Sequence, residues 1–169
     1  MKTWQMKSRS MPGIKPSLQA GAVAVELAFV IIVMLFIVAG IVEFGRVLWY
    51  ADALTKATRD GARLMSNWPV ATLNSGGVVT AKSIAATAAT AANVRPNLDV
   101  TANVLVECLG PSPGFSVIAC SDGTAPANVR VSITGFNVAI GTMVPFIKVY
   151  GGSFGNIPLS PHTTMRYMN

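Results

Sequence analysis

The hydrophobic pattern of the chain begins with one long apolar run. From Ala22 to Val42, 20 of 21 residues are apolar or glycine, and the exception is Glu26. At about 1.5 Å per helical residue, this run crosses a hydrocarbon core roughly 30 Å thick. The pattern therefore predicts a transmembrane helix over residues 22–42. An unpaired carboxylate at that depth costs a few kcal/mol or more, so Glu26 is a candidate functional residue whose partner must be found.

Helical spacing continues past Val42 but becomes amphipathic. One face carries apolar or small residues: Phe44, Val47, Leu48, Ala51, Leu54, Thr58, Ala62 and Met65. The other face carries charged residues: Asp52, Lys56, Arg59 and Arg63. Asp52 lies one turn before Lys56, and Glu43 can reach Arg46. We expect residues 43–66 to extend the helix beyond the membrane, with this charged face either solvated or docked, through Arg59–Arg63, on a partner subunit or on the chain's own head.

Residues 67–169 carry the pattern of a small α+β head. Breakers between Asn67 and Gly77 predict a loop, and the alanine-rich stretch 78–94 predicts a second helix. After Pro96 the apolar period changes to two. It predicts strands near 98–107, 115–120 and 128–136, arranged as an antiparallel meander.

The last part of the head is less regular. The apolar stretch 138–150 is expected to be a short helix or loop, and 157–167 an edge strand limited by Pro158 and Pro161. The fold class is therefore α+β: a long N-terminal helix, a second helix and a small antiparallel sheet of three to four strands.

The charge of the chain is concentrated at its N-terminus. The formal net charge is +6, but Lys2, Lys7, Arg9 and Lys15 all precede Gly21, where no acid occurs. The remainder has nine basic and seven acidic side chains, so nucleic acid is not expected as a partner. Residues 1–21 read as a basic cytoplasmic leader, which favours an orientation with the N-terminus inside.

Cys108 and Cys120 enclose a loop rich in proline and glycine. Their spacing is not CxxC, and no histidine or further cysteine lies nearby, which argues against a metal pair or a redox pair. With the head outside the cytoplasm, a structural disulfide is expected, with two free thiols as the alternative.

Groups suited to catalysis are scarce beyond residue 66. The acids there are Asp99, Glu107 and Asp122, and the chain's one histidine, His162, stands near the C-terminus. No nucleophile triad, zinc-ligand set or phosphate loop is present in the sequence. We expect no enzyme activity, no cofactor and no metal site.

Two simpler interpretations of the apolar run remain open. A secretory signal could be cut after the small residues Val38, Ala39 and Gly40, ahead of Ile41, although the run is longer than a usual signal core and contains Glu26. An uncleaved membrane anchor is the other.

A sharper interpretation comes from the junction of leader and helix. Gly21 ends the basic leader, Ala22 begins the apolar helix, and Glu26 is the fifth residue after the glycine. This arrangement resembles the cleavage signature of type IV pilins. The resemblance implies that a membrane prepilin peptidase cuts between Gly21 and Ala22, and that Glu26 sets the assembly register by meeting the new amine of a neighbouring subunit.

The following residues narrow the resemblance. The segment from about 21 to 65 is similar to the TadE-like family, the pilin-like minor proteins (pseudopilins) of tight-adherence (Tad or Flp) pilus systems. Asp60 stands where that family often has glutamate. The matching positions are Gly21, Val25, Glu26, Glu43, Phe44, Gly45, Arg46, Ala57, Arg59, Gly61, Ala62 and Arg63.

The resemblance implies a structural subunit that takes part in pilus assembly or adhesion. Its partners would be other pilin or pseudopilin subunits, a prepilin peptidase, the inner-membrane assembly platform and membrane lipid. It would sit as a single-pass protein in a bacterial inner membrane with a periplasmic or extracellular head, and enter the pilus on assembly. The alternatives are an uncleaved single-pass scaffold of a secretion complex and a membrane-anchored binding module.

Overall fold

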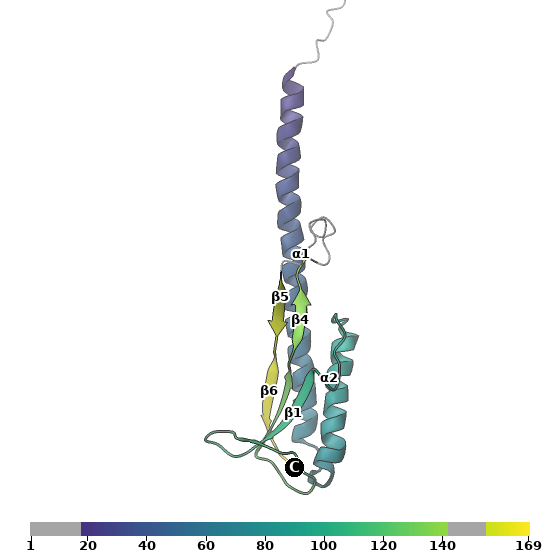
Figure 1. Ribbon diagram of the computed structural model, residues 1–169, viewed down its shortest axis with the longest axis vertical. Coiled ribbons are helices and arrows are strands. Elements are labelled where there is room, and N and C mark those ends of the chain that lie inside the picture. The colour runs from purple at the N-terminus through teal and green to yellow at the C-terminus, as the bar shows by residue number, and fades with distance from the viewer. Residues whose placement is uncertain (1–17, 142–154) are drawn as a thin grey trace, which may run out of the picture. The chain divides into compact units, whose positions relative to one another are not determined.

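The computed structural model of the protein describes residues 18–141 and 155–169. The chain divides into two compact units, Met1–Gly40 and Ile41–Asn169. Helix α1 (Leu18–Ser66) belongs to both, and the remaining elements belong to the second unit (Figure 1). Two of our expectations, the leader before residue 18 and most of the stretch 138–150, fall outside the described residues.

The part of α1 in the first unit has the character predicted for a membrane span. Among the described residues, one helix, within Gly21–Ser66, is long and apolar enough to cross a membrane, with a mean hydropathy of 3.0 in its most apolar window. This window is 0% buried within the described part of the chain. A helix with such a surface requires lipid or another apolar protein around it.

The part of α1 in the second unit ends at Ser66, as predicted, and buries one stripe. The predicted face is correct for Val47, Leu54, Thr58, Ala62 and Met65. It is wrong for two residues that remain exposed, and it omitted three apolar side chains that are buried. Phe44 and Leu48 are exposed, and Tyr50, Ala53 and Ala57 are buried. Compared with the predicted face, the buried stripe is rotated around the helix toward Tyr50. The apolar residues Phe44 and Leu48 belong to a second surface, which faces outward.

The predicted loop 67–77 is largely helical, which corrects that expectation. A 3₁₀ turn η1 (Val70–Thr72) leads into a π-helical segment η2 (Leu73–Val78), followed by α2 (Val79–Ala91), the predicted second helix. The Trp68 indole N–H donates to the Thr72 carbonyl oxygen at 3.0 Å. A Cβ on Gly77 would lie 2.9 Å from the Trp68 ring, so this glycine admits the indole rather than breaking the helix.

The main sheet has four antiparallel strands in the order β2-β1-β3-β6. They are β1 (Val104–Leu109), β2 (Val117–Ile118), β3 (Asn128–Ile133) and β6 (His162–Arg166). The predicted meander is wrong, because β1 lies between β2 and β3. A second sheet pairs β4 (Phe136–Ala139) with β5 (Asn156–Leu159). The single edge strand predicted over 157–167 is divided into β5 and β6, and β6 lies at the edge of the main sheet.

Two strand boundaries differ from prediction for local reasons. The strand expected from residue 98 begins at Val104, because the Asp99 carboxylate accepts from the N–H groups of Thr101 at 2.7 Å and Ala102 at 3.0 Å and closes a turn. The strand expected over 128–136 is divided into β3 and β4 at Gly135, whose φ of +68° favours glycine.

The core of the second unit lies between one face of the main sheet and the two helices. Inward residues of β1 and β3, such as Val104, Val129 and Val131, pack with the buried stripe of α1 and the alanines of α2. On the opposite face, Glu107 and Arg130 form a cross-strand ion pair at 3.5 Å. One face buried and one face solvated explains the period-two pattern of these strands.

Candidate functional site

The predicted cleavage position and register residue lie on exposed helix. Helix α1 begins at Leu18, three residues before Gly21, and Ala22 and Glu26 lie one turn apart on it. All three residues are exposed. Among the described residues, the Glu26 carboxylate has no hydrogen-bond or ion-pair partner. The cation that this acid requires in an apolar environment therefore does not come from the described part of its own chain.

A buried ion pair stands at the start of the second unit. Glu43 is 6% exposed, and its carboxylate accepts hydrogen bonds from Arg46 at 2.7 and 3.2 Å. The same guanidinium donates to the Ala139 carbonyl oxygen in β4 at 2.6 Å and stacks over the Tyr50 ring. Arg46 thus joins α1 to β4, which the sequence interpretation, a local i,i+3 pair, did not foresee.

The environment of Arg46 keeps it charged. Burial would lower the pKa of Arg46, but the hydrogen bond and negative charge of Glu43, with help from Tyr50, hold that pKa above its ordinary value. A permanently charged guanidinium holds both the Glu43 carboxylate and the end of β4. The role of the pair is to fix the second unit onto α1.

The glycines of the family motif have different surroundings. A Cβ on Gly61 would lie 3.2 Å from the Ala81 carbonyl oxygen and 3.4 Å from a Val131 methyl group, so Gly61 lets α1 approach both α2 and β3. A Cβ on Gly45 would meet nothing within 4 Å. Gly61 is explained by the fold of this chain, whereas Gly45 and its exposed neighbour Phe44 are not.

The charged end of the motif lies on the surface. Arg59, Asp60 and Arg63 are exposed, and within the described residues neither guanidinium makes a hydrogen bond or ion pair. This segment contacts the chain's own head through Gly61 and the buried Ala62, and the two arginine side chains take no part in that contact. An open groove of about 420 Å³ lies beside it, lined by Asp60, Arg63, Leu64, Asn67, Trp68 and Ile84.

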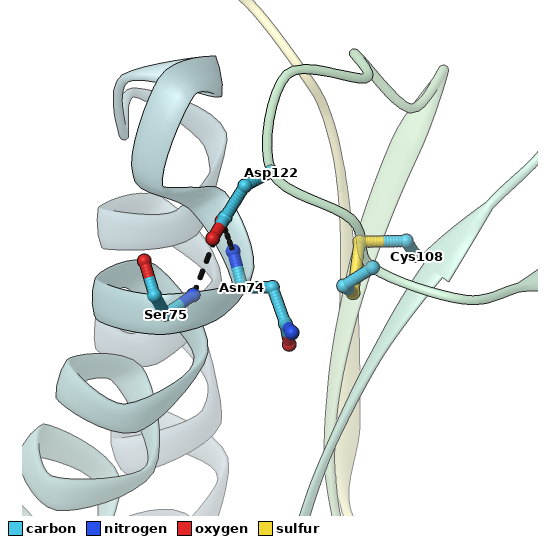
Figure 2. Close-up of a disulfide and its surroundings, with 5 residues drawn as sticks. Asn74, Ser75, Cys108 and Asp122 are labelled. Carbon is cyan, nitrogen blue, oxygen red and sulfur yellow. Dashed lines mark hydrogen bonds between the residues drawn. A yellow bond between two sulfur atoms is a disulfide. The ribbon is translucent and has the colours of Figure 1, made fainter.

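The disulfide between Cys108 and Cys120 is present and fixes the connection that follows β1. Beyond it, the Asp122 carboxylate accepts from the backbone N–H groups of Asn74 at 2.6 Å and Ser75 at 3.1 Å (Figure 2). Gly123 N–H donates to the Val70 carbonyl oxygen at 2.8 Å. The hydrogen bonds from the Ser75 and Asn74 N–H groups lower the pKa of Asp122 below its ordinary value. The loop is thereby held against η1 and η2.

The acids and the histidine considered for catalysis belong to different segments of the described residues. No group of three or more His, Cys, Asp or Glu side chains that could hold a metal ion occurs among them. His162 is exposed at the start of β6. The residues that the structure does bring together serve packing and docking.

One family model matches the first helix of the chain. Residues 21–63 match the family model described as TadE-like protein. They form a TadE-like segment. The match begins at Gly21 and ends at Arg63, so it covers α1 and includes every motif residue named above. No curated protein and no solved structure was found to match the chain.

The structure adds residues that sequence reasoning did not single out. In the sequence, Asp122 is only one of three acids beyond residue 66, yet its carboxylate joins two segments 48 residues apart. Ala139 contributes through its backbone, which leaves no signal in the sequence. Tyr50 could have been found, since it falls three residues after Val47 and four before Leu54 on the buried stripe.

Proposed function

We propose that the chain is a pilin-like structural subunit, a minor pilin or pseudopilin of a Tad pilus, anchored in the membrane by the first part of α1. A prepilin peptidase cuts between Gly21 and Ala22. The new amine of Ala22 then pairs with Glu26 of a neighbouring subunit and sets the register of assembly.

The observation that carries this proposal is the isolation of Glu26. The carboxylate stands in an apolar, uncovered helix, within a TadE-like segment, and has no partner among the described residues. A cation from another chain gives this acid a charge-assisted partner, so the assembled state becomes the electrostatically satisfied one. The predicted leader charge supports a cytoplasmic N-terminus and a periplasmic second unit.

The exposed end of the TadE-like segment supplies a second contact. Arg59 and Arg63 offer two cations beside the groove that contains Trp68. We assign this surface to a neighbouring pilin, pseudopilin or assembly-platform protein, because its charges are not used within the described part of the chain.

Two measurements test the proposal. The intact mass of the membrane-extracted protein should show loss of residues 1–21. Glu26→Ala should leave that cleavage unchanged and abolish incorporation into pili, whereas Asp52→Ala, which removes an exposed acid further along α1, should not affect incorporation. Full-length mass would favour the uncleaved scaffold, and normal incorporation of Glu26→Ala would remove the register role.

One observation favours a binding module as a second candidate. The segment closed by the disulfide exposes apolar side chains, with Phe115 44% exposed before β2 and Val117 60% exposed in β2. If the second unit recognises a surface, Phe115→Ser with Val117→Ser should reduce adhesion while pili still form. Unchanged adhesion of that variant would count against the binding module.

A further inference from the structure

The outward face of α1 stays apolar past the predicted end of the membrane span. Ile41, Phe44 and Leu48 are spaced by three and four residues, so they lie on one face. They are 65%, 64% and 54% exposed, although each belongs to the second unit. The opposite face at this level carries Glu43, Val47 and Tyr50, which are buried in the second unit. The outward face is therefore an apolar surface that the second unit leaves uncovered.

This apolar surface stops sharply after Leu48. The next residue on the same face is Asp52, and Lys56 follows after another four residues. They form an exposed ion pair at 2.6 Å, with side chains 59% and 67% exposed. A change from large apolar to fully charged residues within one helical turn is what a membrane–water boundary imposes on a helix surface.

Trp49 stands at this boundary. Its side chain is 60% exposed, and its indole N–H donates to the Ala92 carbonyl oxygen at 3.1 Å. An exposed ring with a satisfied polar end matches the interfacial position that tryptophan favours in membranes.

The length of the helix agrees with this position. From Ala22 to Trp49 there are 28 residues, which span about 42 Å at 1.5 Å each. That length exceeds the hydrocarbon core of about 30 Å but equals the thickness of a bilayer including its headgroup regions, about 40–45 Å. The membrane span and the outward face of residues 41–49 together account for one whole bilayer.

We propose that the outward face of Ile41, Phe44, Leu48 and Trp49, here called the collar, lies in the outer headgroup region of the membrane before assembly. Lipid is its occupant because the collar is continuous in sequence with the proposed span. The second unit then rests on the bilayer surface, with its buried Glu43–Arg46 pair on the side of α1 away from lipid. This inference rests on the membrane anchoring proposed above.

Fluorescence of the full chain in phosphatidylcholine vesicles tests the collar. The emission of Trp49 is obtained by subtracting the spectrum of the double variant Trp4→Phe/Trp49→Phe from the spectrum of Trp4→Phe. Trp68 is present in both variants. In lipid brominated near the top of the acyl chains, the Trp49 contribution should fall to roughly half or less. The Trp68 signal that remains in the double variant should not change.

A matched pair of variants links the quenching to the collar. Leu48→Asp places a charge on the collar, and Val79→Asp places one on a similarly exposed apolar residue of α2, 62% exposed. Leu48→Asp should reduce the bromine quenching of Trp49 at least about two-fold, and Val79→Asp should leave it unchanged. Both sites are exposed, so both variants should fold.

Flotation of the vesicles separates this inference from the anchoring itself. Protein that floats with lipid while Trp49 is unquenched and open to aqueous acrylamide would overturn the collar and leave the anchor intact. A second result would also overturn the collar: Trp49 is not quenched by bromine, and its shielding from acrylamide depends on the protein-to-lipid ratio. Another copy of the chain would then cover this face. Protein that does not float at all would overturn both.

Discussion

At the residue scale, the two motif glycines Gly61 and Gly45 have opposite surroundings. Gly61 lies where α1 passes within contact of the α2 backbone and of Val131 in β3. Gly45 lies on open helix surface. A glycine in a helix interior costs about 0.5–1 kcal/mol relative to alanine, so Gly45 is an unfavourable choice for the isolated subunit.

We therefore expect opposite effects from the same substitution. Gly61→Ala should destabilise the chain by about 1–3 kcal/mol, because the new methyl group meets a backbone oxygen at 3.2 Å. Gly45→Ala should stabilise it by about 0.5–1 kcal/mol. Thermal unfolding in detergent, followed by circular dichroism, measures both, and a loss of stability in Gly45→Ala would contradict the open environment described for it.

The Glu43–Arg46 pair gives a second prediction at this scale. Arg46→Met keeps the length of the side chain but removes the cation from Glu43 and the donor from Ala139. We expect a loss of about 2–3 kcal/mol, because a buried carboxylate and a backbone carbonyl lose their bonds together.

The exposed Lys56–Asp52 pair provides the control for that substitution. Lys56→Met should change stability by less than about 0.5 kcal/mol, since surface ion pairs are weak. Urea unfolding of both variants gives the comparison. Equal effects would show that the burial of Arg46 and Glu43 carries no energetic weight.

At the scale of elements, the loop after β2 is held by charge as well as by the disulfide. Asp122 accepts two backbone N–H groups at the start of η2, and its pKa is lowered by them. This bond joins the disulfide-closed loop to the segment that packs around Trp68, so the two irregular regions of the fold support each other.

The lowered pKa of Asp122 predicts a pH dependence with a definite sign. The carboxylate contributes stability that is fully present above its unfolded pKa, about 3.9, and is lost as pH falls through the lower folded pKa. At pH 7, Asp122→Asn should therefore be less stable than the unmodified chain, and the difference should disappear at the acid end of the titration. Unfolding midpoints measured across pH 2–7 test this, and a difference that is independent of pH would contradict it.

Prediction of elements from the sequence succeeded where the pattern was long and regular. Both long helices and the exposed–buried alternation of β3 followed from composition and periodicity, and the edge position of β6 agrees with Pro161, which directly precedes that strand. The segment 67–77 failed because its glycines accommodate Trp68, and that contact is not visible in the sequence. The strand order failed because period-two patterns specify which residues face inward but not which strands are neighbours.

At the scale of the whole molecule, the chain joins an apolar helix to a folded second unit, and the exposed Arg59 and Arg63 make no ion pair within the described residues. Stability and assembly are therefore expected to depend on different residues. The buried stripe of α1 holds the second unit together, and Glu26, Arg59 and Arg63 are available to other chains.

A double variant separates these two functions. Arg59→Ala with Arg63→Ala should leave thermal stability within about 0.5 kcal/mol, because both side chains are exposed. It should reduce incorporation into pili, which is measured by immunoblotting of sheared filaments. Lys82→Ala, which removes a cation from α2, serves as the control. Normal incorporation of the double variant would remove this surface from the proposed assembly contacts.

The sequence by itself determined the membrane-length helix, the position of Glu26 within it, the TadE-like motif and the α+β class, because these depend on composition and spacing along the chain. Only the tertiary structure decided that Glu43 is buried and that Arg46 bonds to β4, that Asp122 holds η2, that β1 is a central strand, and that Phe44 and Leu48 face away from the core. These features depend on which distant segments meet. Burial and hydrogen bonding between such segments are properties of the packed chain, and local periodicity does not encode them.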